Sequence, residues 1–399
     1  MNRIIFGSAN HWTSPYQVGS HAWARLFARH GWRTLYLSDP VTPWHWLDRN
    51  SWERTRERFA LWFGNGVLEE ESRLKAWTPF SLVSPRNSAF FRSDGVLRHW
   101  PELAFPSVQH KARQWGFESP DLLWLDSVRH AGWGMELRPK KTVLRVADWS
   151  AGLKAAPRAA LELEQDLVRK CDLVVVSAQS LEERLKPLRD GKPMATIRNG
   201  VDFEFWNQPV VSPEEYAEIP APRIIYVGAL DEWFDLPLLF ELARALPKVS
   251  FVLIGQRRFP LESGASPSNV YWLGVRPRGQ ARAWLRYAQL GIIPFRRTEL
   301  IECVCPLKLY EYMACGLPVV ATRWKELEYM RSPALLAEGV EEWVAHLQKL
   351  LEMTGSFAPL GASSLARYGR EKLLAYAREN DWRQRWRQWE VAYQGIRAS

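Results

Sequence analysis

The sequence predicts an α/β protein with two Rossmann-like, doubly wound domains, and three observations lead to this prediction. Segments with strand and helix periodicity alternate through the first half of the chain, the pattern breaks near residues 199–222, and it then restarts. In the second half, three strands end at glycine: Gly228, Gly255 and Gly274. Doubly wound sheets bind ligands at the carboxyl ends of their strands, so these glycines indicate a ligand site.

The first half is expected to form a parallel sheet covered by helices. A helix over 17–29 follows from apolar residues three or four positions apart, and Gly31 ends it. Short apolar runs between such helices indicate buried strands. The expected strands are Arg3–Gly7, Arg33–Leu37, Leu122–Leu125, Thr142–Val146 and Asp172–Ser177, and the other expected helices are Ala159–Lys170 and Ser180–Leu188.

The second half repeats this alternation after a segment without periodicity. Residues 208–222 are rich in Pro and Glu, which is typical of a linker between domains. The expected strands that follow are Arg223–Val227, Val249–Ile254, Val270–Leu273, Leu290–Pro294 and Leu317–Ala321, with helices at Leu236–Leu246, Gly279–Tyr287 and Pro306–Cys315. We therefore predict domains over 1–205 and 206–370, and helices over 371–399 that return to the first domain.

Composition excludes several classes of protein. The chain has 399 residues, 47% of them hydrophobic and 24% charged, which is typical of a globular protein. Its apolar runs are far shorter than the roughly 20 residues of a membrane-spanning helix, and its first residues are too short an apolar run for a signal peptide. The four cysteines do not form a secreted disulfide framework, so we expect a cytoplasmic location.

Basic charge and tryptophan content suggest contact with an anionic membrane. The formal net charge is +9, and there are 22 tryptophans. Both features meet in Trp44–Phe63, where six aromatic residues alternate with arginines 49, 54, 56 and 58, as in interfacial amphipathic helices. The alternative is a surface helix that packs its aromatic residues on the domain core. Basic charge alone would fit nucleic acid equally well.

The most informative motif is Cys305–Thr322, CPLKLYEYMACGLPVVAT. Pro306 can begin a helix, because the first helical position needs no N–H. Lys308 then lies in the first turn, where free N–H groups and the helix dipole already favour phosphate. Glu311 follows three residues later on the same face, where its carboxylate can accept hydrogen bonds from a ribose diol.

This segment resembles the donor-binding helix of GT-B glycosyltransferases, in the broad group that includes family 4. IYVGALDEWFDLPLLF at Ile225–Phe240, SFVLIG at Ser250–Gly255 and GIIPF at Gly291–Phe295 are similar to teichuronic-acid-type polysaccharide glycosyltransferases. The opening Gly7–Leu26 and the tail Ala375–Arg385 also fit that group. The resemblance implies the GT-B fold, in which two Rossmann-like domains face each other across a cleft and a C-terminal helix returns to the first domain.

The resemblance also implies roles in donor binding. Lys308 and Leu307 inherit contacts to the nucleotide, and Glu311 inherits the ribose. Gly228 stands where such enzymes place backbone against phosphate, and Arg276 stands where the base is held. The donor is expected to be a nucleotide diphosphate sugar, most simply a UDP-sugar.

The sequence departs from family 4 in two places. That family has two glutamates eight residues apart, but the position eight before Glu311 is Cys303, with Glu302 beside it. The Arg and Lys pair after the first strand of the second domain is replaced by Asp231-Glu232-Trp233. These departures leave open whether the reaction retains or inverts configuration, and they bring the chain closer to the inverting glucuronosyltransferase of xanthan assembly. Glu302 is expected to help position the donor sugar.

An inverting transferase needs a general base beside the acceptor hydroxyl. Asp148 stands at the carboxyl end of the strand Thr142–Ala147, so we expect it to be this base; the alternative is an Asp that caps a turn. Asp126 also follows a strand, while His11, Trp12 and His21 lie on or near the first strand-to-helix loop. We expect these four residues to contact the acceptor.

Together these observations predict a glycosyltransferase that moves a sugar to a lipid-linked or polysaccharide acceptor, peripherally bound to the cytoplasmic membrane. No bound cofactor or metal is expected, because Cys303 and Cys305 are too close for a typical zinc pair and the helix can neutralise the diphosphate. Two alternatives stay open: a GT-B nucleotide-sugar epimerase, and a basic nucleic-acid-binding protein, although no nucleic-acid motif is present.

Overall fold

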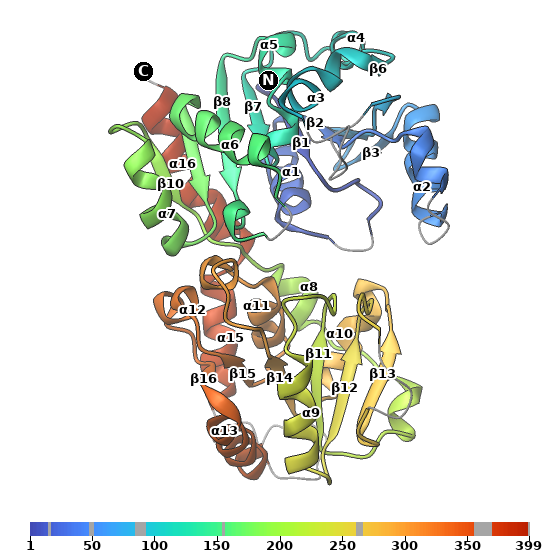
Figure 1. Ribbon diagram of the computed structural model, residues 1–399, viewed down its shortest axis with the longest axis vertical. Coiled ribbons are helices and arrows are strands. Elements are labelled where there is room, and N and C mark those ends of the chain that lie inside the picture. Colours follow the sequence, from blue (N-terminus) through green and yellow to red (C-terminus); the bar gives the residue numbers. More distant parts are fainter. Residues whose placement is uncertain are drawn as a thin grey trace. The chain divides into compact units, whose positions relative to one another are not determined.

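The computed structural model describes residues 1–14, 17–47, 52–83, 93–153, 156–260, 266–354 and 369–397. The chain forms two compact units, each built around its own sheet (Figure 1). The first unit consists of Met1–Arg198 with Trp386–Ser399, and the second consists of Asn199–Arg385. The predicted α/β class with two Rossmann-like domains is confirmed.

The first unit is built on an eight-stranded sheet in the order β10-β9-β8-β7-β1-β2-β4-β3. All neighbouring strands are parallel except β3 and β4. The strand order reverses between β1 and β7, so ligands are expected beyond the carboxyl ends of these two strands. The strands are β1 (Arg3–Ser8), β2 (Arg33–Ser38), β3 (Val67–Glu69), β4 (Leu74–Trp77), β7 (Leu122–Leu125), β8 (Lys141–Val146), β9 (Leu173–Val176) and β10 (Met194–Thr196).

Aromatic side chains fill much of the core of this unit. Trp23, Trp124 and Trp389 are buried and lie 5.1 to 6.4 Å apart, ring centre to ring centre. Trp389 belongs to α16, which is red in Figure 1 and packs here although it is the last helix of the chain. The helices are α1 (Gly19–Arg29), α2 (Trp52–Phe63), α3 (Asp94–His99), α4 (Val108–Gln114), α5 (Trp133–Leu137), α6 (Arg158–Lys170), α7 (Gln179–Leu185) and part of α16 (Trp382–Arg397). Strands β5 (Phe80–Ser81) and β6 (Ala104–Phe105) form a separate two-stranded antiparallel sheet.

The second unit is a six-stranded parallel sheet in the order β13-β12-β11-β14-β15-β16. Its order reverses between β11 and β14, which is the arrangement of a dinucleotide-type Rossmann domain. The strands are β11 (Arg223–Val227), β12 (Ser250–Ile254), β13 (Val270–Gly274), β14 (Leu290–Ile293), β15 (Val319–Thr322) and β16 (Leu335–Ala337). The helices are α8 (Phe203–Asn207), α9 (Leu236–Ala245), α10 (Arg278–Arg286), α11 (Leu307–Ala314), α12 (Lys325–Met330), α13 (Gly339–Thr354) and α15 (Arg370–Glu379).

The boundary between the units differs from the expected one near 205. The second unit begins at Asn199, because Val201 pairs with Asp381 and the side chains of Phe203 and Trp206 are part of the second core. The predicted linker at 208–222 therefore runs along the second unit, and it contains one 3-10 turn, Glu214–Ala217.

The expected return of residues 371–399 to the first unit also needs correction. Helix α15 stays in the second unit and packs on α11, with Tyr376 stacked on Tyr310 at 5.9 Å between ring centres. Only the chain from Trp386 onward belongs to the first unit. The Asp381 carboxylate marks the turn between α15 and α16, since it accepts hydrogen bonds from the amides of Phe203 and Arg383.

Candidate active site

Glycines line the carboxyl edge of the second sheet. Gly228 and Gly255 both have φ of +150°, a conformation that side chains disfavour. The Gly228 amide donates to Ile254, and the Gly255 amide donates to Gly274, so the three strand ends lie in register. A Cβ on Gly255 would lie 1.8 Å from the Gly228 carbonyl oxygen, which leaves no room for a side chain. At these glycines the carboxyl edge of the sheet consists of backbone without side chains, which lets a ligand approach closely, as the sequence indicated.

Lys308 reaches this edge at the point where the strand order reverses. It is the second residue of α11, which begins at Leu307 with Pro306 as its N-cap, one residue later than predicted. Its ammonium lies 5.2 Å from the Tyr226 ring centre and 4.9 Å from that of Phe295, on β11 and just after β14. A Cβ on Gly228 would lie 3.1 Å from the Lys308 Nζ. The ammonium thus lies against glycine backbone at the switch point.

Burial lowers the pKa of Lys308 from 10.5 to about 8, although the nearby Glu311 opposes this fall. Glu311 shows the complementary shift: burial raises the pKa of its carboxyl, and the charges of Arg278 and Lys308 oppose the rise. Both side chains are half-buried. Neither makes a hydrogen bond or a close ion pair with another residue in the part of the chain that the structure describes. Two charged groups without close partners at one strand edge can bind a ligand that carries both phosphate and hydroxyl groups.

The remaining donor residues lie around this pair. Leu307 is half-buried as the first residue of α11. Arg276 follows β13, and its guanidinium lies 3.7 Å from the Glu215 carboxylate. Arg278, which the sequence did not single out, stacks on the Phe205 ring at 4.8 Å and acts electrostatically on Glu311. Its place at the start of α10, just after a strand, is the signal that could have identified it.

Glu302 has a different setting from the one expected. Its carboxylate accepts a hydrogen bond from the Lys325 amide at 2.7 Å, at the beginning of α12, and from the Arg297 guanidinium at 3.2 Å. Cys303, eight positions before Glu311, is fully buried. The carboxylate of Glu302 thus already stabilises a helix terminus.

In the first unit, Asp148 and Asp126 follow neighbouring strands but differ in environment. Asp148 has solvent-exposed surface beyond the end of β8, yet desolvation by the surrounding protein raises the pKa of its carboxyl, and the charge of Arg145 opposes that rise. Asp126 is buried, and its carboxylate accepts from Trp124 at 3.1 Å and lies 3.3 Å from the Arg145 guanidinium. The carboxylate of Asp126 thus forms an ion pair within the unit, whereas Asp148 is exposed; contact of Asp126 with an acceptor stays a prediction.

The histidines and tryptophan near the first loop divide in the same way. Trp12 and His21 are buried: Trp12 donates to Glu69 at 2.7 Å, and the His21 ring bonds the His11 carbonyl at 3.1 Å. These contacts hold the loop in place, and the acceptor contacts expected of Trp12 and His21 stay predictions. His11 itself is half-buried at the loop surface, and its ring lies 3.0 Å from the Thr13 hydroxyl.

Sequence reasoning missed an ion cluster after β2. The Asp39 carboxylate lies 2.6 Å from the Arg129 guanidinium and 3.1 Å from the ring of the buried His130. Burial would raise the pKa of Asp39, but Arg129 and His130 hold it down at about 2. Asp39 follows a strand directly, which is the same signal that identified Asp126 and Asp148.

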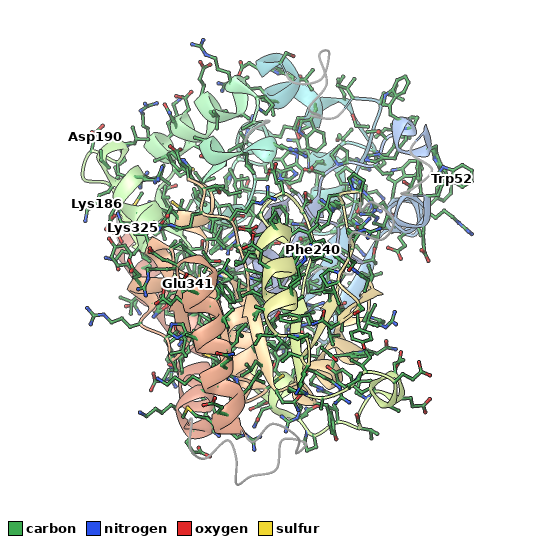
Figure 2. The ribbon with its side chains drawn as sticks, turned by 60° about the horizontal axis from the view of Figure 1, so that its bottom comes forward. Trp52, Lys186, Asp190, Phe240, Lys325 and Glu341 are labelled. Carbon is green, nitrogen blue, oxygen red and sulfur yellow. The ribbon has the colours of Figure 1, made fainter. Side chains whose placement is uncertain are left out.

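Exposed apolar side chains gather on α2 and the segments that contact it. Trp44, Trp46 and Trp52 are exposed, and Trp52 lies at the outer side of the ribbon in Figure 2. Their rings are tied to backbone: Trp44 donates to Leu82, and Trp52 donates to Trp46. Trp62 donates to the Phe105 carbonyl, which links α2 to the two-stranded β5–β6 sheet. We call this set the aromatic platform; its exposed members are Trp44, Trp46, Trp52, Phe63, Leu82, Leu103 and Phe105.

The described arginines of this segment differ in exposure. Arg56 is exposed, but Arg54 and Arg58 are half-buried, and Arg58 donates to the carbonyls of Asp39 and Pro40. Arg49 lies outside the described residues. The helix therefore carries apolar groups on its outer side and two arginines turned toward the sheet edge.

Neither a metal-binding cluster nor a membrane-spanning helix occurs in the described residues. No group of three or more His, Cys, Asp or Glu residues there could hold a metal ion. None of the helices in those residues is both long enough and apolar enough to cross a bilayer.

Comparisons with known proteins agree with the two-unit architecture. Residues 221–353 match the family described as glycosyl transferases group 1. Over 209 residues, 48% of this chain, the sequence is 24% identical to TuaH of Bacillus subtilis (strain 168), a provisionally named teichuronic acid biosynthesis glycosyltransferase. That match spans about half, 51%, of the relative's length.

Solved structures resemble the whole chain. A sucrose-phosphate synthase from Thermosynechococcus elongatus has a TM-score of 0.72 at 16% identity, and each chain is covered completely. Anabaena Alr3699/HepE in complex with UDP-glucose has a TM-score of 0.63 at 14% identity with the same coverage. An α,α-trehalose 6-phosphate synthase from Burkholderia multivorans has a TM-score of 0.66 at 14% identity and covers 100% of this chain and 99% of its own.

Proposed function

We propose that this protein, which has the GT-B fold and carries a glycosyl transferases group 1 domain over residues 221–353, transfers a sugar from a UDP-sugar to an acceptor at a membrane surface. The acceptor is lipid-linked or a growing polysaccharide. The complex of HepE with UDP-glucose supports a uridine nucleotide as donor, and the match to TuaH supports an envelope polysaccharide as product.

One observation carries the proposal: the Lys308 ammonium lies against Gly228 at the switch point of the second sheet. A diphosphate there receives a formal positive charge together with the free N–H groups of the first turn of α11. The same groups stabilise the negative charge that develops on the diphosphate as the glycosidic bond breaks. We propose that they do so without a bound metal or other cofactor.

Neighbouring residues hold the rest of the donor. Glu311 accepts hydrogen bonds from the ribose hydroxyls, with Arg278 favouring its ionised form. Leu307 and Arg276 contact the nucleotide, Arg276 at the base. We assign no chemical step to Glu302, because its carboxylate already binds Arg297 and the amide of Lys325.

We propose that Asp148 is the general base that removes the proton of the acceptor hydroxyl in an inverting transfer. Its exposure gives an acceptor access to it, and the raised pKa of its carboxyl makes it a better proton acceptor than an ordinary aspartate. The carboxylates of Asp126 and Asp39, which follow β7 and β2 of this sheet, are instead engaged in ion pairs.

Nucleotide binding tests the donor assignment. UDP and UDP-sugars should raise the melting temperature of the full chain more than ADP or GDP do. Glu311→Gln should weaken the affinity for UDP about tenfold or more, because the glutamine side-chain amide accepts hydrogen bonds from a ribose diol less strongly than a carboxylate does. Lys248→Met, an exposed change at the opposite edge of the same sheet, serves as the control. If no nucleotide diphosphate shifts the melting temperature of the unchanged protein, the proposal is wrong.

We propose that the aromatic platform places the protein on the inner face of the cytoplasmic membrane. Phe63 and Phe105 are 81% and 70% exposed, far more than aromatic residues that belong to a core, and exposed Arg56 lies among them. Anionic vesicles should bind the protein better than neutral ones do. The double variant Trp52→Ser, Phe63→Ser should bind them about tenfold more weakly. The control variant Val211→Ser removes a similarly exposed apolar group from the second unit and should bind anionic vesicles as the unchanged protein does. If the unchanged protein, the double variant and the control bind these vesicles equally, the aromatic platform does not contact the membrane.

A further inference from the structure

Two arginines on α2 face the carboxyl edge of the first sheet. Arg58 donates two hydrogen bonds of 2.8 Å to the carbonyls of Asp39 and Pro40, just after β2, and it lies 3.0 Å from the His45 ring. Arg54 lies one turn earlier on the same helix face. It is half-buried, and it makes no hydrogen bond or close ion pair within the described ranges.

The first strand-to-helix loop presents His11 beside these arginines. Strands β1 and β2 are paired in register up to Ser8 and Ser38, so the loops that follow them begin side by side. The loop after β1 is fixed by two hydrogen bonds to its backbone: the His21 ring bonds the His11 carbonyl, and the Tyr36 hydroxyl donates to the Asn10 carbonyl. His11 is therefore a fixed group at the switch point of this sheet.

The electrostatics around His11 are one-sided. Burial lowers its pKa to about 3, and the other causes, Arg58, His21, Arg54 and His45, all act in the same direction. Asp39, which follows β2, is already paired with Arg129 at 2.6 Å. The site thus has an excess of positive charge, and His11 stays neutral and able to give or accept one hydrogen bond at physiological pH.

We propose that His11, Arg54 and Arg58 form an anion site that binds the phosphate or diphosphate group of the acceptor. A guanidinium pairs with two phosphate oxygens at once, and the planar fork of Arg54 has no other close partner in the described chain. The same helix carries Trp52 and Phe63 on its outer side, so an acceptor with a phosphate head and an apolar tail fits both features. This inference rests on the proposed function and names the acceptor class for it.

Direct binding of phosphate-bearing probes tests this site. The full chain is titrated with farnesyl diphosphate, farnesol and inorganic pyrophosphate, with UDP saturating so that the donor site is filled. Farnesyl diphosphate should bind at least tenfold more tightly than farnesol. Pyrophosphate should also bind, more weakly, because the phosphate chemistry is the same without the tail. If farnesol and farnesyl diphosphate bind equally, the site does not recognise phosphate and the proposal is overturned.

Matched variants locate the binding on α2. Arg54→Gln should weaken binding of both farnesyl diphosphate and pyrophosphate about tenfold, while Arg56→Gln, an equal charge change on the exposed side, should stay within twofold. Equal losses in the two variants would indicate a diffuse charge effect and overturn the assignment. An unchanged thermal response to UDP in Arg54→Gln shows that the variant is folded.

The test separates this inference from the proposed function. Repeating the pyrophosphate titration in a Lys308→Met background removes the donor-site cation without relying on UDP. If UDP fails to bind the unchanged protein but Arg54→Gln still weakens pyrophosphate binding about tenfold in the Lys308→Met background, the donor assignment fails while the anion site stands. If UDP binds as expected but Arg54→Gln has no effect, only the anion site fails.

Discussion

Replacing Lys308 with methionine should make the ligand-free protein more stable while removing donor binding. The fall of its pKa from an ordinary 10.5 to about 8 means that the folded state disfavours the charged form. That difference corresponds to at most about 3 kcal/mol, and local relaxation and water reduce it, so we expect Lys308→Met to gain about 2 kcal/mol at pH 7. Methionine has a similar length and can lie on the Tyr226 and Phe295 rings.

The gain should depend on pH in a defined direction. A lysine with a lowered folded-state pKa destabilises the protein at every pH below about 8, and this effect disappears as pH rises through 8 to 10.5. The stability difference between Lys308→Met and the unchanged protein should therefore shrink by about 1 kcal/mol between pH 7 and pH 9. Urea denaturation at both pH values measures it. Lys248→Met, which removes an exposed charge, should show no such change.

Donor affinity should follow the same ionisation. The protonated fraction of Lys308 falls about tenfold between pH 7 and pH 9, so UDP should bind about tenfold more weakly at pH 9. Lys308→Met should bind UDP weakly and equally at both pH values. If Lys308→Met is less stable than the unchanged protein at pH 7 and still binds UDP with the same pH dependence, Lys308 is neither an unfavourable buried charge nor the cation that binds the donor.

Three further predictions follow from single contacts. Gly228→Ala should lower the stability of the second unit by about 1 to 3 kcal/mol and weaken UDP binding, because alanine is strained at φ +150° and its Cβ would lie 3.1 Å from the Lys308 Nζ; normal UDP affinity in the variant would contradict this. Asp148→Asn should lower kcat by about 100-fold or more while leaving the UDP-induced rise in melting temperature unchanged, and a normal rate would exclude it as the base. The pKa of Asp39 is about 2 in the folded protein, so its ion pair should stabilise the first unit by about 2 kcal/mol above about pH 4, and this stabilisation should be lost as pH falls through 2. Asp39→Asn should remove that pH dependence in urea denaturation. The prediction is wrong if the variant and the unchanged protein lose stability identically as the pH falls.

The central strands were predictable because burial leaves a strong pattern. A strand covered on both faces reads as a continuous apolar run, and Leu173–Val176 and Arg223–Val227 were predicted to within one residue at each end. Strand β3, Val67–Glu69, was missed because it is short, antiparallel and largely exposed at the sheet edge. Its register depends on pairing with β4, which local periodicity does not report.

The candidate site was predictable where one element supplies the chemistry. Lys308 and Glu311 share one helix, so their spacing fixes their common face before any tertiary contact is known. Asp39 and Arg129 are 90 residues apart, and only the sheet order brings them together. The orientation of Arg58 could not be predicted from the sequence either. On an amphipathic helix, the same sequence spacing allows an arginine to face solvent or to donate to backbone carbonyls, as Arg58 does.

The departures from the two-glutamate pattern give Lys308 its particular importance. Glu302 stabilises the beginning of α12, and Cys303 is sealed in the core, so neither is free to balance charge near a donor. The ammonium of Lys308 is then held in a partly buried place that disfavours its charge until an anion arrives. A diphosphate would restore the ordinary pKa of that lysine on binding, so part of the protein's stability is traded for affinity toward an anionic ligand. This trade explains why a folded protein would keep an unfavourable lysine beside Gly228, where an apolar residue would pack better.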